Sequence, residues 1–466
     1  MPTTTTTTTT PLTPTEQEYA LSSLQKLITF PTVAATAVDS GAYVDCANYL
    51  LEQLQSIPVL DQIHILPESP SHSPVVVGRW KGQDETLPVL LLNSHYDVVP
   101  ALVDDWTVPP FSGVRRNGNV YGRGTQDMKC VCIQYVEAIR KIHTAFPDFQ
   151  PTRSIYLTFV PDEEVGGSGM AAFLESSLYK TTLPGIALAL DEGLASEDHV
   201  FSVFYGERLP WWINVEATGN VGHGSRFIQH TAVEQLIDLA NKALAFREGQ
   251  RKELHGECLH DAANCSHAVA AKRIARDRKK KKKTLGDVTS LNITTLQAGV
   301  QVAGKYAYNC VPPKANCSLD IRISPHVEPS EISNMLDMWC QECSKDPAQG
   351  HVLEWQYIGG TGNCLQQHAT TATDAKVNPW YGVFCDSLQS MGYEIQPQVF
   401  PAATDSRFLR ALGIRALGFS PMRNTEILLH ENDEYIPEST FLEGIEVYVG
   451  LVRTLASQPR GIADDE

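Results

Sequence analysis

The sequence predicts a mixed α/β protein of two domains, in which the second domain is inserted into the first. Three observations support this prediction. The chain has 466 residues, which is more than one ordinary domain of about 100–200 residues requires. Short aliphatic runs typical of buried strands alternate with segments of helical periodicity. This alternation changes to another order of elements after residue 210 and returns near residue 374.

Composition and charge exclude several classes of protein. Hydrophobic residues make up 42% and charged residues 20% of the chain, as in ordinary globular proteins. With 54 acidic and 37 basic side chains the net charge is −17, which argues against a nucleic-acid partner. Eleven cysteines, an odd number, indicate free thiols in a reducing compartment. The chain has no long apolar run and no signal-peptide pattern, so we expect a cytoplasmic protein without a membrane span.

The first domain is expected to hold a largely parallel sheet. Apolar residues recur at helical spacing over 16–30 and 43–54, at its beginning. Strands and helices then alternate, which is typical of parallel sheets covered by helices. The predicted strands are 75–80, 89–93, 155–160, 186–190 and 415–419, and the other predicted helices are 127–143, 169–178, 380–391 and 438–456. Reactive side chains in such folds gather beyond the carboxyl ends of the strands.

The inserted domain, residues 210–360, has the order βαββαβ, which predicts an α+β ferredoxin-like unit. Its predicted strands are 211–218, 288–297, 316–323 and 351–358, and its helices are 231–247 and 328–343. Residues 16–209 and 361–466 then form the first domain, and the Thr/Pro-rich residues 1–15 form a disordered tail. Residues 272–283 carry nine Lys or Arg and one Asp. We interpret this basic run as a solvated loop rather than a polyanion site.

Acidic and histidine side chains follow several of the predicted strands. His95 and Asp97 emerge from the end of the strand at 89–93, where the acid is able to orient the imidazole of a metal ligand. A capped loop with a surface histidine explains this pair equally well. Asp127 follows a glycine-rich turn at the start of a helix, where an ordinary N-cap is the alternative to a ligand.

A run of three acids, from Asp162 to Glu164, ends the strand at 155–160. Crowded carboxylates at a buried strand end repel one another and lose hydration unless a cation compensates, so metal ligation is favoured over a solvated turn. Asp191 and Glu192 end the next strand, and His430 follows an apolar pair near the C-terminus.

Four segments of the chain resemble motifs of metallopeptidase family M20, and within it they look most like those of the aminoacylases. They are Thr-Phe-Val-Pro-Asp-Glu-Glu-Val-Gly-Gly at 158–167, Ala-Leu-Asp-Glu-Gly at 189–193, Ala-Thr-Asp-Ser-Arg at 403–407 and Ala-Leu-Gly-Phe-Ser-Pro-Met at 416–422. The resemblance covers nearly the whole chain. It implies a zinc-peptidase-like catalytic domain with a lid and dimerisation domain inserted.

The resemblance also implies two Zn²⁺ ions per chain, bridged by Asp127. One ion is also held by His95 and Glu192, with Asp191 as the alternative to Glu192, and the other by Glu164 and His430. Asp97 becomes the acid behind His95. The ligand types suit zinc, although related metals occupy such sites too.

Further roles follow from the same resemblance. Glu163 is the general base and then the general acid, and His223 in the lid stabilises the oxyanion. Arg407, Asn309 and Arg322 hold the carboxylate of the amino-acid product. Arg322 is equally well explained as an exposed strand residue or an ion-pair partner.

The expected function is hydrolysis of N-acyl-L-amino acids to a carboxylate and a free amino acid, a small-molecule reaction. A dipeptidase or carboxypeptidase is the alternative, and a non-catalytic binding protein is a third. The resemblance further implies a homodimer, in which His223 of each lid reaches the metal site of the neighbouring subunit.

Overall fold

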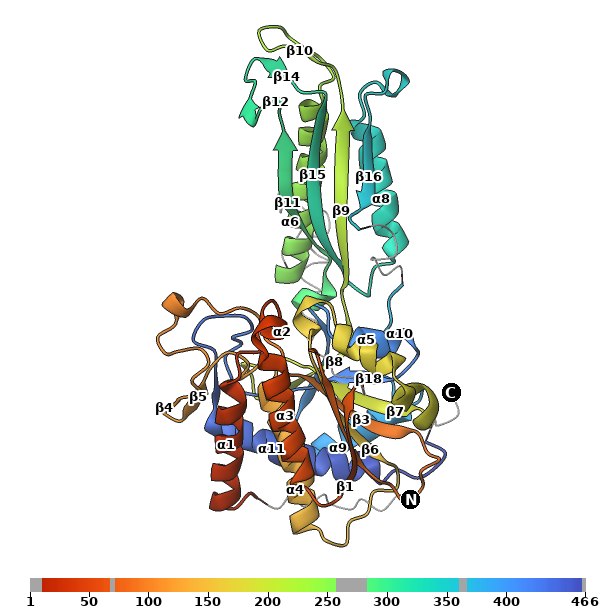
Figure 1. Ribbon diagram of the computed structural model, residues 1–466. Helices are drawn as coiled ribbons and strands as arrows, with labels where there is room; N and C mark the ends of the chain where they lie inside the picture. The colour runs from red at the N-terminus through yellow and green to blue at the C-terminus, as the bar shows by residue number, and fades with distance from the viewer. Residues whose placement is uncertain (1–10, 68–71, 257–282, 360–366, 463–466) are drawn as a thin grey trace. The chain divides into compact units, whose positions relative to one another are not determined.

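The structure is a computed structural model that describes residues 11–67, 72–256, 283–359 and 367–462. It divides the chain into two compact units, shown in Figure 1. Unit 1 comprises residues 1–205, 369–397 and 404–466, and unit 2 comprises residues 206–368 and 398–403. The basic run at 272–283 lies outside the described residues, apart from Lys283.

The predicted disordered tail, residues 1–15, extends too far along the chain. Helix α1 (Pro14–Ile28) begins inside it, and the Thr13 side chain caps the helix by accepting a hydrogen bond from the amide of Glu16. Leu12 is buried in the main hydrophobic core. A capping box and one anchored apolar residue therefore order the chain from about residue 12, while residues 1–10 lie outside the described part.

Unit 1 is built on an eight-stranded sheet. Its order is β1 (Leu60–Leu66), β2 (Val75–Trp80), β6 (Ile155–Val160), β3 (Val89–His95), β7 (Ile186–Asp191), β18 (Ala416–Gly418), β8 (Phe201–Glu207) and β17 (Ile395–Phe400). The neighbours β6, β3, β7 and β18 run parallel. The pairs β1–β2, β2–β6 and β18–β8 are antiparallel. The predicted α/β fold with parallel central strands is thus confirmed.

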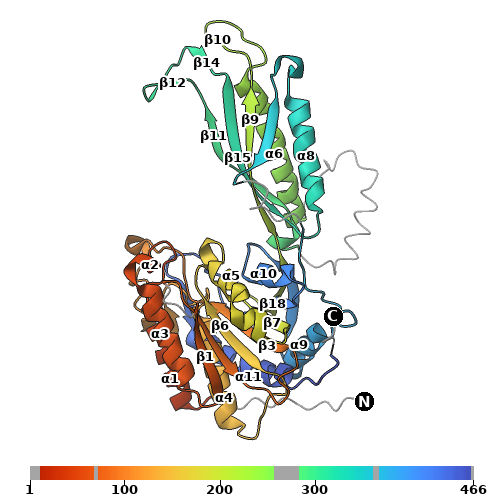
Figure 2. The same cartoon turned by 45° about the vertical axis from the view of Figure 1, so that its right-hand side comes forward.

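Helices cover both faces of this sheet, as Figures 1 and 2 show. Every residue of β3 and β6 is buried, as expected of parallel strands covered on both sides. Helices α5 (Ser168–Glu175) and α10 (Ser406–Ala411) pack on one face. The other face is covered by α1, α3 (Ala42–Gln55), α4 (Lys129–Ala145), α9 (Pro379–Ser390) and α11 (Glu438–Ala456).

Unit 2 contains a four-stranded antiparallel sheet with two helices. Along the chain its main elements are β9 (Leu209–Thr218), α6 (Ala232–His255), β11 (Ser290–Ala298), β15 (Lys314–Ile323), α8 (Pro329–Cys343) and β16 (Leu353–Tyr357). The strand order in the sheet is β11, β15, β9, β16. Residues of β9 and β15 alternate between buried and less buried positions, and the buried ones pack with α6 and α8 in one core. One face of the sheet is therefore covered by the helices.

Two further observations bear on the expectations from composition. The eight cysteines within the described residues are all free thiols. Among the described helices, none combines the length and the apolar character that a membrane crossing requires.

Candidate active site

The acids and histidines predicted at the strand ends of unit 1 lie close together. His95 is the last residue of β3, Glu163 and Glu164 form a short 3₁₀ helix directly after β6, and Glu192 directly follows β7. Because these three strands are parallel neighbours, their carboxyl ends meet at one edge of the sheet. Asp127 lies two residues before the start of α4, and a cis peptide bond joins it to Met128.

Asp127 lies between two histidines. Its Oδ1 is 3.0 Å from His95 Nε2, and its Oδ2 is 3.4 Å from His430 Nε2. His430 Nε2 is also 3.2 Å from Glu164 Oε2, and His95 Nε2 is 3.8 Å from Glu192 Oε2. The side chains form two groups whose ligand atoms lie within 4.8 Å of one another: Asp127, Glu164 and His430, and His95, Glu163 and Glu192.

Asp97 contacts the imidazole of His95, as expected, and also the backbone of two glutamates. The Nδ1 atom of His95 lies 3.1 Å from the carbonyl oxygen of Asp97 and 3.5 Å from its carboxylate. The two carboxylate oxygens accept hydrogen bonds from the backbone amides of Glu163 and Glu164, each at 3.1 Å. Asp97 therefore orients His95 and also fixes the turn that presents both glutamates.

The other acids of the two strand-end runs are held by hydrogen bonds. Tyr43 and Ser168 donate to the carboxylate of Asp162 at 2.8 and 2.6 Å. Asp191 accepts hydrogen bonds from Asn93 at 2.9 Å and from Ser406 at 2.6 Å. With both of its oxygens engaged, Asp191 is less available as a ligand than its neighbour.

The metal-ligand interpretation fits the donor set. Oε1 of Glu164 and Oε2 of Glu192 are buried and have no hydrogen-bond partner in the part of the chain that the structure describes. Buried carboxylate oxygens without partners are costly unless a cation compensates them. Two imidazoles with several carboxylates are also ligands that suit zinc.

Protonation of these groups reflects crowding and burial. Burial, together with the charge of Asp127, raises the pKa of Glu192 well above its usual range. Glu163 likewise has its pKa raised well above the usual value, by burial first and then by the charges of Asp405 and Glu164. The hydrogen bonds that the His430 imidazole donates to the carboxylates of Asp127 and Glu164 raise its pKa to about 10. Glu163 and Glu192 therefore favour the protonated form, and His430 favours the cationic form. Both preferences are expected where negative charge exceeds positive charge.

Glu434 is a residue of the site that sequence reasoning missed. Its carboxylate is fully buried and accepts hydrogen bonds from Arg123 at 2.8 Å and from the amides of Gln126 at 2.7 Å and Gly124 at 3.1 Å. Arg123 also donates to the carbonyl oxygen of His430 at 3.2 Å. The Arg123–Glu434 pair thus connects the turn before Asp127 to the segment of His430. No local pattern marks Glu434, which follows three other polar residues.

Arg407 and Asp405 lie near the glutamates. A guanidinium nitrogen of Arg407 is 3.9 Å from Oε1 of Glu163. Both carboxylate oxygens of Asp405 are buried without a hydrogen-bond partner among the described residues. Burial first, and then the charge of Asp191, raises the pKa of Asp405 to about 8.

The remaining predicted residues belong to unit 2. His223 lies on the short strand β10 (Gly222–His223), which pairs with β14 (Cys310–Val311), and its Nε2 is 3.5 Å from the side-chain nitrogen of Asn309. Arg322 on β15 donates to both carboxylate oxygens of Asp320, at 2.8 and 3.1 Å. The ion-pair interpretation of Arg322 therefore has a partner within the same strand.

Comparisons with known proteins agree with the geometry. The sequence profile described as "Peptidase family M20/M25/M40" matches residues 91–454. Aminoacylase-1 of Dictyostelium discoideum is 39% identical over 420 residues, covering 89% of this chain and 93% of that protein. Aminoacylase-1 of Sus scrofa is 40% identical over 387 residues, covering 83% and 84%.

Solved structures show the same fold at low sequence identity. A tripeptidase from Staphylococcus aureus aligns with a TM-score of 0.64 and 15% identity, covering 95% of this chain and 99% of the other. Human carnosine dipeptidase 1 aligns with a TM-score of 0.62 and 15% identity, covering 95% and 97%. From its profile match and its similarity to full-length relatives, this chain belongs to peptidase family M20/M25/M40.

Proposed function

We propose that this protein is an aminoacylase, a hydrolase that cleaves N-acyl-L-amino acids to a carboxylate and a free L-amino acid. The observation that carries the proposal is the 39–40% identity to aminoacylase-1 proteins over most of both chains. The cluster of Asp127, Glu164, His430, His95 and Glu192 supports it with the residues that a metal-dependent hydrolase of amides needs.

The proposed cofactor is a pair of Zn²⁺ ions with Asp127 between them. His95 and Glu192 would hold one ion, and Glu164 and His430 the other. Bound ions of this kind polarise an amide carbonyl and make water a stronger nucleophile at neutral pH. The unpartnered oxygens of Glu164 and Glu192 support this assignment.

Glu163 is the proposed proton carrier. It is buried, and its raised pKa suits a group that takes a proton near neutral pH. It would remove a proton from the attacking water and return it to the leaving amine nitrogen. Asp97 contributes by holding the backbone amide of Glu163, which limits the positions that the carboxylate can take.

Recognition of the substrate carboxylate is assigned to Arg407. Arg407 lies beside Glu163 and would pair with the carboxylate of the substrate. A small hollow beside Asp127 is lined mainly by apolar residues: Leu194, Ala195, Met422, Ile427 and Leu429. Its free volume is about 10 Å³, which is room for about one water molecule and too little for an acyl group.

Unit 2 is the proposed ferredoxin-like lid and dimerisation domain. Its βαββαβ order and its single covered sheet face support this assignment. We propose a homodimer in which His223 stabilises the oxyanion in the partner's site, with Asn309 and Arg322 contributing to carboxylate binding. A cytoplasmic location is proposed on the odd number of cysteines and the free thiols.

The two adjacent glutamates provide a matched pair of variants for a test. Because Glu163 also lies within ligand distance of His95 and Glu192, the test must separate a base from a ligand. Glu163→Gln should lower kcat by roughly 10²–10⁴ and leave the zinc content unchanged. Glu164→Gln should lower the zinc content itself. Full activity in Glu163→Gln, or loss of zinc from it, would overturn the assignment of the base.

Substrate class is decided by a panel assayed with zinc. An aminoacylase should hydrolyse N-acetyl amino acids with apolar side chains faster than dipeptides. Faster turnover of dipeptides would make the protein a dipeptidase or carboxypeptidase, and no turnover of either class would favour a binding protein.

The lid assignment is tested by complementation. Glu163→Gln chains, which keep an intact lid, are refolded together with His223→Ala chains, which keep an intact base. Activity should return if His223 acts across the dimer. A mixture that stays inactive, or a monomer in sedimentation, would reject this part of the proposal.

A further inference from the structure

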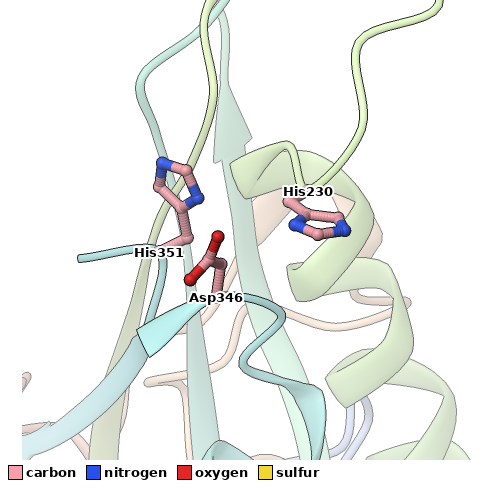
Figure 3. A group of neighbouring side chains, drawn as sticks. All are labelled: His230, Asp346 and His351. Carbon is pink, nitrogen blue, oxygen red and sulfur yellow. The ribbon is translucent and has the colours of Figure 1, made fainter. Parts of the chain in front are cut away.

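A second group of metal-ligating side chains lies within unit 2. His230, Asp346 and His351 each offer one ligand atom, and these atoms lie within 4.8 Å of one another. In Figure 3 the carboxylate of Asp346 lies between the two imidazole rings. The three residues come from two connections, one between β9 and α6 and the other between α8 and β16. None of them belongs to the acids and histidines of unit 1.

The backbone places Asp346 and His351 on the same side of a short ribbon. The two residues form an antiparallel bridge, in which the amide of His351 donates to the carbonyl of Asp346 at 3.0 Å and the amide of Asp346 donates back at 3.4 Å. Directly opposite residues of an antiparallel pair project their side chains to the same face. A 3₁₀ turn (Pro347–Gln349) closes the loop between them.

Buried hydrogen bonds tie His230 to this ribbon. His230 immediately precedes Thr231, the residue that caps α6. In the first turn of α6, the fully buried Gln235 donates to the carbonyl of Thr218 at 2.7 Å and accepts from the amide of Lys345 at 3.0 Å. The start of α6 and the residue before Asp346 therefore share one bridging side chain. His230 also adopts φ 57°, a left-handed conformation that few residues other than glycine adopt.

The polar atoms of the group lack competing partners. Nδ1 of His351 is buried and makes no hydrogen bond within the described residues. Lys345, the residue before Asp346, is paired with Asp238 at 2.6 Å. Over the same described residues, the carboxylate of Asp346 has no ion pair and the imidazole of His230 no hydrogen bond. A carboxylate without a counter-charge that lies within 4.8 Å of two imidazoles is a site suited to a cation.

We propose that His230, Asp346 and His351 form a third metal site, separate from the catalytic cluster, that takes a divalent ion of the zinc type. Two imidazoles, one carboxylate and a water complete four-coordinate zinc. Ligand atoms on one zinc ion lie about 3.4 Å apart, given bonds of about 2.0–2.1 Å. The ligand atoms now lie within 4.8 Å of one another. Rotation about the soft terminal torsions of these side chains would bring them to about 3.4 Å. The ion would fasten the start of α6 to the α8–β16 connection.

The test counts zinc in the full-length protein. Metal-free protein is titrated with Zn²⁺, and bound zinc is measured after gel filtration for wild type, His351→Ala and Asp346→Asn. Each variant should bind one equivalent of zinc less than wild type, or bind that equivalent at least about tenfold more weakly. Asp346→Asn keeps the size of the side chain and the backbone bridge, so it separates ligand loss from misfolding. The test depends on the difference in bound zinc between wild type and each variant, so it holds for any number of ions in the catalytic cluster.

His326→Ala is the matched control. His326 is an exposed histidine of unit 2, paired with Asp287 at 3.2 Å, and lies outside the group of three. This variant should bind as much zinc as wild type. Amide hydrolysis by zinc-loaded His351→Ala should stay within about twofold of wild type, because the site takes no part in the reaction. Equal zinc binding by wild type, His351→Ala and Asp346→Asn would overturn the proposal.

Discussion

Glu434 offers the sharpest test of how the site is held in place. Its two carboxylate oxygens accept hydrogen bonds from Arg123, Gly124 and Gln126, and all of these contacts are buried. Glu434→Gln keeps the size of the side chain but leaves only one acceptor oxygen. The amide nitrogen must then face either the guanidinium of Arg123 or the backbone amides, so two donors oppose each other. Arg123 also loses its buried counter-charge.

The expected cost follows from burial. The side chains of Arg123 and Glu434 are 3% and 0% exposed, and breaking such a buried pair by changing one partner costs about 3–5 kcal/mol. The ion pair of Arg423 and Glu443 is the matched control, since each side chain is 27% exposed and the closest contact is 2.6 Å. Partly exposed pairs contribute about 0–1 kcal/mol. Glu434→Gln should therefore lower the free energy of unfolding several times more than Glu443→Gln.

The measurement is urea-induced unfolding of the metal-free proteins, followed by circular dichroism and extrapolated to water. A second readout is zinc affinity, which should fall about 10- to 100-fold in Glu434→Gln because the segments of Asp127 and His430 are no longer connected. If Glu434→Gln were as stable as Glu443→Gln and bound zinc as tightly as wild type, the positioning role of Glu434 would be refuted.

Three further predictions concern metal, substrate and pH. Chelation should abolish amide hydrolysis and added Zn²⁺ should restore it; activity that survives chelation would contradict the metal assignment. Arg407→Ala should raise KM for N-acetyl amino acids about 10- to 100-fold, the equivalent of one lost charged hydrogen bond, while the corresponding amides stay poor substrates for both proteins. Because burial raises the pKa of Asp405 to about 8, the metal-free folded protein binds a proton that the unfolded chain releases near pH 4, so this carboxyl lowers stability as pH rises from about 4 to 8. Asp405→Asn should flatten that slope in unfolding measurements at pH 5–9, and an unchanged slope would assign it to other groups.

Much of unit 1 was predictable because its signals are local. The aliphatic runs of β3, β6 and β7 mark strands buried on both faces, and the amphipathic pattern of α11 marks its limits at residues 438 and 456. Polar residues directly after such strands were correctly expected to meet, since neighbouring parallel strands end at one edge of the sheet. The strands β1, β8 and β17 were missed. β1 contains Asp61, Gln62 and His64 among its seven residues, so its period-two pattern is weak.

The sequence by itself determined that His95, Glu163 and Glu164 lie at strand ends and that Asp127 lies at the start of a helix, because consecutive residues carry the periodic pattern of burial. Only the tertiary structure decided which distant groups meet these residues. Glu434 contacts the Asp127 turn across more than 300 positions, and the cluster of unit 2 joins His230 to a ribbon more than 100 residues later. Such contacts depend on how whole helices and strands pack against one another. Local patterns of polarity do not specify which distant segments come together.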